Sequence, residues 1–354
     1  MAVDLSPKSA EKVYESNGGS YSRWSDLPIL IKENIGTAKL SLLKDGFALP
    51  SYSDSSKVAY VLQGGGVAGI VLPESEEKVI AIKKGDALAL PFGAVTWWYN
   101  KEDTELVVLF LGDTSKAHLP GFFADFHLIG SNAIFTGFSL EFISRAWDLK
   151  EDEVITLARS QPDQGIIKLE DNFKMPETNN EHRQSLVLNC DEAQPDIDVY
   201  YGGRVVVLNT RKFPLLGKIG LGANFVTLEG NAMRSPGFSY DSALQVMYIV
   251  RGSGRVQVAG ATWERVLEFD LSAGCLFIIP RFLVVSMIAN SEGMEWFSVI
   301  TTPDPVFTYL AGETSVWQAL SPQVFEASFN VDSDVARRVR DRKTSGAVFF
   351  PRPY

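Results

Sequence analysis

The chain carries the same pattern of residues twice, and this internal repeat constrains the fold more than any other feature. The segment AYVLQGGGVAGIVLP resembles MYIVRGSGRVQVAG, so that Tyr60 corresponds to Tyr248 and Gly64 to Gly252 at an offset of 188. KKGDALALPFGAV resembles LSAGCLFIIPRFLVV, and FSLEFISRAWDL resembles LSPQVFEASFNV, in the same order. The chain is therefore a duplication, with one copy near 20–163 and the other near 198–345.

Each copy opens with short apolar runs separated by Gly, Pro or Asp-Ser clusters. Many short strands at such spacing favour an all-β sandwich or barrel. The glycine clusters at Gly64 and Gly252 lie between such runs and predict hairpin turns rather than phosphate loops. In the first copy, the expected strands are Ala59–Leu62, Val67–Leu72, Ala87–Leu90 and Leu106–Leu111.

Each copy closes with a pattern typical of helices. Within Ser139–Leu157, Ser139 can cap the first turn of a helix and the acidic LKEDEV leads into a further helical turn, and Ser321 opens the corresponding segment of the second copy. The stripes that follow are Phe142, Ile143, Ala146 and Trp147 in the first copy and Val324, Phe325, Ser328 and Phe329 in the second. We therefore expect an N-terminal arm (1–19), a first barrel with a helical extension (20–163), a polar linker (164–197) and a second barrel with its extension (198–354).

Composition excludes several function classes. Forty-three acidic and 33 basic residues give a net charge of −10, which argues against nucleic acid and does not support an anionic membrane surface. The longest apolar stretch, Cys275–Ala289, is interrupted by Pro280 and Arg281, so no membrane span is expected. Two cysteines exclude a disulfide framework, and the N-terminal segment has no apolar core of a secretory signal. These features favour a cytoplasmic protein.

Three segments carry a resemblance to a known family. They are GGRVVVLNTRKFPLLGKIGLGANFVTLEGNAMRSPGF, YIVRGSGRVQV and LAGETSVWQALSPQVFEASFNVDSDVARRVRDRK. The chain resembles the cupin superfamily, and closely the bicupins known as legumin-type (11S) seed storage globulins, from about residue 20 to 350. The resemblance implies an all-β fold of two tandem cupin jelly-roll β-barrels with α-helical extensions. It also implies self-assembly into a homotrimer or hexamer and a storage, nutrient-reservoir role in a plant.

The chain departs from that family in three respects. No signal peptide is expected from its first residues, and Asn189-Cys190 stands where the family has an Asn-Gly processing site. The first copy has no cysteine, so the family's disulfide between the two halves cannot form. We therefore expect a non-secreted, globulin-like protein.

Catalytic cupins hold a divalent metal with the motifs G-x5-H-x-H-x3–4-E and P-x-G-x2-H, in which H-x-H places two imidazoles on one strand face. None of the eight corresponding positions in this chain holds the metal-binding residue of the motifs. These positions are Ser51, Ser53, Lys57 and Thr96 in the first copy and Gly237, Ser239, Gln245 and Val285 in the second. Such side chains do not form a transition-metal site. We expect no metal and no cofactor.

The three histidines, His118, His127 and His182, match no ligand spacing. Packing or loop roles are favoured for them, and a displaced metal or acid–base site is the alternative.

Strand alternation predicts a pocket inside the first barrel. It directs Lys57, Thr96 and Trp98 inward, where they could hold an anionic or aromatic ligand. The alternative is that Lys57 extends to the rim and Trp98 fills the core. A buried lysine would need a carboxylate, a bound anion or a depressed pKa. The proposed ligand-binding residues are Ser51, Ser53, Lys57, Thr96 and Trp98, whereas the second barrel offers the apolar filling Gln245, Met247, Val285 and Met287.

Two functions follow. The first is a metal-free, storage-like or small-ligand-binding protein without enzyme activity. The alternative is a metal-independent cupin enzyme, isomerase-like or epimerase-like, that uses the first barrel.

Overall fold

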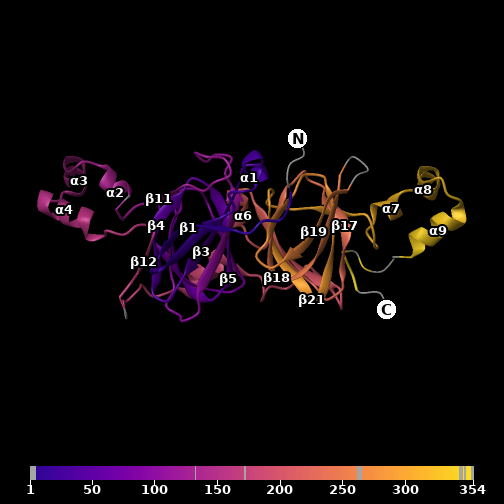
Figure 1. Ribbon diagram of the computed structural model, residues 1–354, viewed down its shortest axis with the longest axis horizontal. Coiled ribbons are helices and arrows are strands. Elements are labelled where there is room, and N and C mark those ends of the chain that lie inside the picture. The colour runs from indigo at the N-terminus through magenta and orange to yellow at the C-terminus, as the bar shows by residue number, and fades with distance from the viewer. Residues whose placement is uncertain are drawn as a thin grey trace. The chain divides into compact units, whose positions relative to one another are not determined.

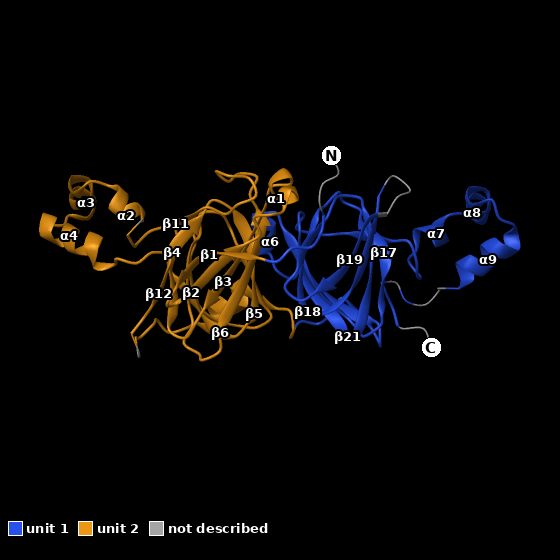
Figure 2. Cartoon of the chain, viewed as in Figure 1, with its two compact units in different colours: residues 1–9, 193–354 blue, residues 10–192 orange. Residues whose placement is uncertain are grey.

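The computed structural model describes residues 5–131, 133–170, 173–260, 265–342, 346 and 348–351. The chain divides into two compact units, one formed by residues 10–192 and the other by residues 1–9 with 193–354 (Figure 2). Within the described ranges, no helix is long and apolar enough to cross a membrane. Each unit is a β-barrel with a helical extension (Figure 1).

The first barrel is built from two sheets. One has the strand order β1-β2-β3-β10-β5-β8-β13, and the other has the order β11-β4-β9-β6-β7 with β12 also pairing β4. The pairings between these strands are antiparallel, as expected for a jelly roll. The strands are β1 (Glu11–Ser16), β2 (Gly19–Arg23), β3 (Ile35–Leu42), β4 (Gly46–Ser53), β5 (Ser56–Gln63), β6 (Gly65–Val71), β7 (Lys78–Lys83), β8 (Asp86–Leu90), β9 (Val95–Tyr99), β10 (Leu106–Asp113), β11 (Asp125–His127), β12 (Ile166–Lys168) and β13 (Val187–Asn189).

In the second barrel the corresponding strands are joined into one 10-stranded sheet. Its path is β14-β15-β16-β21-β17-β22, with β18 pairing β19, β20 and β21, and with β23 pairing β17. The strands are β14 (Ile197–Val199), β15 (Gly203–Leu208), β16 (Gly222–Leu228), β17 (Met233–Ser239), β18 (Gln245–Ala259), β19 (Arg265–Ser272), β20 (Leu276–Ile279), β21 (Val284–Ile300), β22 (Phe307–Tyr309) and β23 (Phe349–Phe350). Thus β18 covers the span of β5 and β6, and β21 covers that of β9 and β10.

The glycine clusters do not form hairpins, and this corrects the expectation from sequence. Gly64 and Gly252 both have a φ of 74°, which glycine adopts without strain. Strand β5 pairs with β8 and β10, whereas β6 pairs with β7 and β9, so the chain changes sheets at Gly64. In β18 the strand continues, and the register against β21 shifts between Gly252 and Gly254. The positive φ therefore serves a change of sheet at Gly64 and a register shift within β18 at Gly252.

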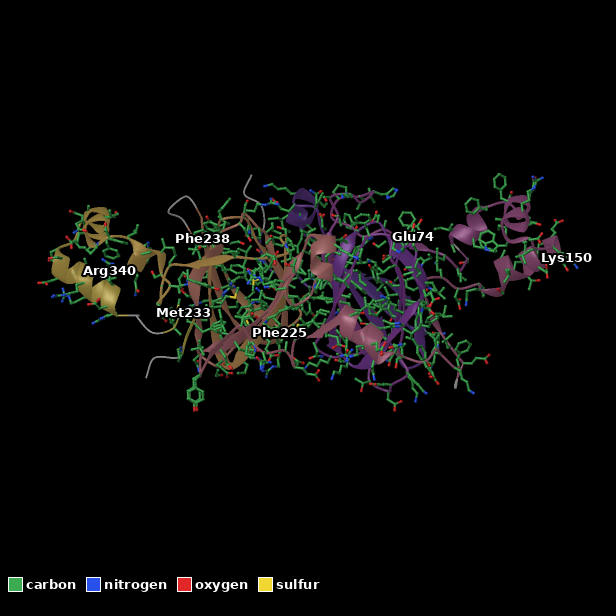
Figure 3. All side chains as sticks on the ribbon, turned by 180° about the vertical axis from the view of Figure 1, so that it is seen from behind. Glu74, Lys150, Phe225, Met233, Phe238 and Arg340 are labelled. Atoms are coloured by element: carbon green, nitrogen blue, oxygen red, sulfur yellow. The ribbon has the colours of Figure 1, made fainter. Side chains whose placement is uncertain are left out.

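Helices close both repeats, as the sequence predicts. Ser139 caps α3 by accepting a hydrogen bond from Phe142 N, and Ser321 precedes α8, which opens on Pro322. Arg340, labelled in Figure 3, donates to Gln318 O at 2.9 Å and joins α9 to α7. The helices are α1 (Pro28–Lys32), α2 (Ile134–Gly137), α3 (Leu140–Trp147), α4 (Glu151–Ser160), α5 (Asn180–Leu186), α6 (Leu215–Ile219), α7 (Val316–Ala319), α8 (Pro322–Phe329) and α9 (Ser333–Asp341).

The segments expected to be an arm and a linker carry structure of their own. Strand β1 and the start of β2 lie within residues 1–19, and β12, α5 and β13 lie within 164–197. The fully buried Asp86 anchors the second segment, because it accepts from both terminal nitrogens of Arg183 (2.6 and 2.8 Å) and from Asn189 Nδ2 (2.7 Å). Residues 10–19 and 164–192 therefore belong to the first unit, where β1, β12 and β13 pair with strands of its barrel, whereas residues 1–9 and 193–197 belong to the second unit.

Candidate functional site

The first barrel contains a cavity of about 290 Å³. Strands β2, β3, β4, β5, β9, β10 and β11 contribute its lining, together with Tyr14 of β1 and the segment 164–166. The apolar and aromatic lining residues are Tyr14, Tyr21, Leu40, Ala48, Leu49, Trp98, Phe110 and Ile166. The polar ones are Ser51, Lys57, Thr96, Asp125, His127 and Gln164.

Four of the five predicted ligand-binding residues line this cavity: Ser51, Lys57, Thr96 and Trp98. Ser51 and Thr96 are direct partners across β4 and β9. Ser53 does not line the cavity, although it faces inward by alternation. It lies beyond Tyr52, the last residue of β4 to pair with β9, and there it is buried opposite Asp125 of β11. Its hydroxyl has no hydrogen-bond partner among the described residues.

Lys57 is buried, with 8% of its surface exposed, and does not extend to the rim. Its Nζ lies 3.1 Å from Asp125 Oδ1. The same ammonium group lies 4.7 Å from the ring centre of Phe123 and 5.2 Å from that of Phe110. A carboxylate and two aromatic faces thus compensate a charge that would be costly to bury alone.

Tyr21 completes this group from the opposite side of Asp125. Its hydroxyl donates to Asp125 Oδ2 at 3.2 Å. Burial, and after it the negative charge of Asp125, raises the pKa of Tyr21 well above its usual value. The phenol therefore stays protonated at neutral pH and donates its hydrogen bond to Asp125.

Asp54, just after β4, holds the loop that leads into β11. Its carboxylate accepts from His118 N at 3.0 Å, Ala124 N at 3.2 Å and the Ser55 hydroxyl at 2.8 Å. Burial opposes ionisation, but these hydrogen bonds, that from His118 N first, outweigh it and lower the pKa of Asp54. Since Ala124 immediately precedes Asp125, Asp54 holds the backbone next to the residue that pairs with Lys57.

His127 lies two residues after Asp125 on β11 and also lines the cavity. Its Nδ1 is buried and has no hydrogen-bond partner within the described ranges. His127 therefore does more than fill space, because one of its ring nitrogens lies beside the cavity without a hydrogen-bond partner among the described residues.

Sequence reasoning missed Tyr14, Tyr21, Asp125 and Gln164. Tyr14 and Gln164 lie in the segments expected to be an arm and a linker, and the Tyr14 hydroxyl donates to Gln164 O. Asp125 and His127 could have been found, because their spacing of two in FFADFHLIG is the alternation of a strand.

No group of three or more His, Cys, Asp or Glu side chains close enough to hold a metal ion occurs among the described residues. The absence of a bound metal stays a prediction for elemental analysis.

Large side chains occupy the interior of the second barrel. Met247, Val285 and Met287 are buried there, and Gln245 Nε2 donates to Ser298 Oγ at 3.1 Å. The interior also holds Arg234 of β17, 4% exposed, which the sequence analysis did not single out.

Comparison with known proteins places these features in context. A model of the family described as Cupin matches residues 5–155 and 188–337. Glutelin type-D 1 of Oryza sativa subsp. japonica is 29% identical over 381 residues, covering 87% of this chain and 78% of that protein. Cocosin 1 of Cocos nucifera is 27% identical over 380 residues, and this alignment covers 90% of this chain and 81% of cocosin 1.

Solved structures are similar over nearly the whole chain. Procruciferin, an 11S globulin from Brassica napus, superposes with a TM-score of 0.90 at 24% identity, covering 100% of this chain and 98% of that one. An 11S globulin from Wrightia tinctoria, described as revealing an auxin binding site, superposes with a TM-score of 0.88 at 27% identity, covering 98% and 95%. The two-barrel architecture is thus shared with 11S globulins.

Proposed function

Because the chain belongs to the cupin family, as a legumin-like bicupin, we propose that it is a storage-globulin-like protein that binds a small organic molecule inside its first barrel. The observation that supports ligand binding is the cavity around the buried Lys57 and its half-buried partner Asp125. Its relatives are seed storage globulins and glutelins, which supports the storage-like part.

The lining defines the chemistry of the ligand. The rings of Trp98 and Phe110 meet edge to face at 5.5 Å between centroids and offer flat apolar walls. Lys57 supplies hydrogen-bond donors, but Asp125 already neutralises the lysine and accepts the one hydrogen of the Tyr21 hydroxyl. This combination suits a small planar aromatic molecule with one weakly acidic group. The auxin site described for the Wrightia tinctoria globulin supports indole-3-acetic acid as a first probe.

Calorimetric titration of the full chain with indole-3-acetic acid tests this. We expect one site per chain in the wild type and at least tenfold weaker binding to Lys57→Met. Lys44→Met, which removes an exposed lysine of the same unit, is the matched control and should bind like the wild type. Unchanged binding by Lys57→Met would place the site elsewhere. If the protein does not bind the probe and the purified protein releases no molecule when it is denatured, the proposal that the first barrel binds a small organic molecule is overturned.

A metal-independent isomerase or epimerase is the second candidate. The Tyr21 phenol, hydrogen-bonded to Asp125, and the His127 imidazole face one cavity, and both are side chains of the kind that transfer protons in enzymes. Such an enzyme would exchange a carbon-bound proton of its substrate with solvent. Proton NMR of the molecule released from the protein, after incubation with the protein in D₂O, would show loss of a C–H signal, and His127→Gln would prevent that loss.

We also propose that the chain assembles into a homotrimer or hexamer. Phe142 and Trp147 of α3 are 65% and 56% exposed, and Val324 and Phe329 of α8 are 48% and 49% exposed. Apolar groups gathered on short helices favour burial against another copy of the chain.

A cytoplasmic location is part of the proposal as well. Both cysteines are thiols, Cys190 buried and Cys275 half-buried, and this suits a reducing compartment.

A further inference from the structure

Arg234 brings a buried positive charge into the second barrel. It pairs with Met287 across β17 and β21, and both residues are buried, with 4% and 1% of their surfaces exposed. Val285 and Met287 belong to the cluster of buried residues inside this barrel, so this part of the strand pair faces the interior. A guanidinium group stays protonated at every pH at which a protein is folded.

The surroundings of Arg234 do not neutralise this charge. The guanidinium carbon lies 5.8 Å from the ring centre of Trp296 and 5.7 Å from that of Phe307, which provides only cation–π attraction. No ion pair joins Arg234 to a carboxylate among the described residues, and its NH1 nitrogen is buried without a hydrogen-bond partner there. A buried cation of this kind favours a counter-ion.

The second barrel lacks the carboxylate that neutralises the buried cation of the first barrel. Asp125 of β11 pairs with Ser53 of β4, and Phe307 of β22 pairs with Ser239 of β17 at the equivalent place. Thus the residue that neutralises Lys57 in the first barrel is replaced by phenylalanine in the second. The carboxylate has been lost from this position, whereas a cation is still present in the barrel.

A second unpaired donor lies beside the guanidinium group. The indole Nε1 of Trp296 is fully buried and also has no hydrogen-bond partner among the described residues. Indole N–H is a donor only, so two buried donors lack an acceptor among the described residues, on side chains whose guanidinium carbon and indole ring centre lie 5.8 Å apart. An anion that accepts from both would satisfy the charge and both donors at once.

We propose that the second barrel binds one small monovalent anion, of chloride size, between the guanidinium group of Arg234 and the indole N–H of Trp296. The ion must be small, because Met247, Phe277 and Met287 already fill the interior with at most 1% of their surfaces exposed. This site is distinct from the organic ligand of the first barrel and does not depend on it.

Thermal unfolding of the full chain tests the proposal. Sodium chloride replaces sodium gluconate at constant ionic strength, since gluconate is too large to enter. We expect the wild-type Tm to rise by about 3 °C, as binding to the folded state alone requires. Arg234→Met should fold, because methionine suits the apolar neighbours. The Tm of this variant should be the same in chloride as in gluconate. Arg255→Met, which removes an exposed arginine of the same unit, should respond like the wild type.

Crystals soaked in bromide provide the second measurement. An anomalous peak within hydrogen-bond distance of Arg234 in the wild type, absent in Arg234→Met, would support the site. The same chloride response in Arg234→Met as in the wild type would overturn the proposal, because the ion would then act elsewhere. No response in the wild type together with no bromide at Arg234 would overturn it as well.

Discussion

Ala48 in the first barrel and Arg234 in the second occupy the same register position. Ala48 pairs with Trp98, Arg234 pairs with Met287, and in both strands the register shifts before the next inward pair, Ser51 with Thr96 and Gly237 with Val285. Ala48 lines the first cavity, whereas the long side chain of Arg234 occupies the equivalent place in the second barrel. One small residue in place of a large one thus helps to keep the first barrel open.

Substitution of Ala48 by methionine should close the first cavity. The longer side chain would extend into the space beside Trp98, so we expect the affinity for indole-3-acetic acid to fall at least tenfold in calorimetric titrations. Because the methionine fills existing space, the free energy of unfolding should change by less than the cost of overpacking a filled core, about 1–3 kcal/mol.

Ala81→Met is the control for this substitution, because Ala81 is an exposed residue of β7 in the same unit. It should leave both the affinity and the stability near the wild-type values. Full retention of binding in Ala48→Met would contradict the assigned position of the ligand.

The Lys57–Asp125 pair should behave as a coupled unit in stability measurements. Lys57→Met leaves the Asp125 carboxylate in a mostly buried place, and Asp125→Leu leaves the ammonium group there. Because the lysine and aspartate side chains are 10% and 23% exposed, solvent reduces the penalty, and we expect each change to cost about 1–3 kcal/mol in urea unfolding.

The double variant Lys57→Met/Asp125→Leu should recover much of that loss, because no unpaired charge remains. Single-variant costs that simply add up in the double variant would show that the two charges do not stabilise each other.

The sequence predicts the fold well, because the repeat and the alternation of apolar residues report on burial. Alternation also predicted that Lys57, Thr96 and Trp98 face inward. The prediction that Ser53 lines the cavity was wrong, because alternation gives the direction of a side chain and does not show where the neighbouring strand ends. It also gave no indication of Tyr21, which reaches Asp125 from a strand 104 residues away in sequence.

The two barrels differ through partners that are distant in sequence. Arg234 looks like a surface residue in EGNAMRSPGF, and only the pairing of β17 with β21 shows that it is buried. Likewise, whether Gly64 forms a hairpin or a bend between sheets depends on the partners of β5 and β6, which residues near Gly64 do not specify.

Asp54 should contribute to resistance against acid. Its pKa is lowered in the folded state, so its contribution is present above the unfolded value of about 4 and is lost as the pH falls through the folded value. Asp54→Asn removes the charge and should cost about 1–2 kcal/mol at pH 7, as expected for buried hydrogen bonds to a charged acceptor.

Urea unfolding at pH 7, 4 and 3 measures this effect. The difference in stability between the wild type and Asp54→Asn should shrink as the pH falls below 4. Asp103, whose hydrogen bond and ion pair with Lys44 lie in solvent, provides the control, and Asp103→Asn should have little effect at pH 7. A difference that stays constant with pH would exclude the charge of Asp54 as the cause.

The purified protein should carry no stoichiometric metal. The positions that bind metal in catalytic cupins hold serine, threonine, lysine, glycine, glutamine and valine here. We expect elemental analysis to find well below one equivalent of Mn, Fe or Zn per chain, and EDTA to leave the Tm unchanged. One equivalent that survives dialysis against EDTA would contradict this prediction.

Self-assembly should depend on the apolar side chains of the two helical extensions. Phe142 and Val324 are 65% and 48% exposed in the single chain, and an aspartate at either place would have to be buried without a partner at an interface. Light scattering at micromolar concentration should give a multiple of 39.0 kDa for the wild type and 39.0 kDa for Phe142→Asp/Val324→Asp. Tyr240→Asp, at an aromatic residue outside the extensions that is 68% exposed, should assemble like the wild type. A wild-type mass of 39.0 kDa, or an unchanged assembly of the double variant, would show that these helices do not join the copies.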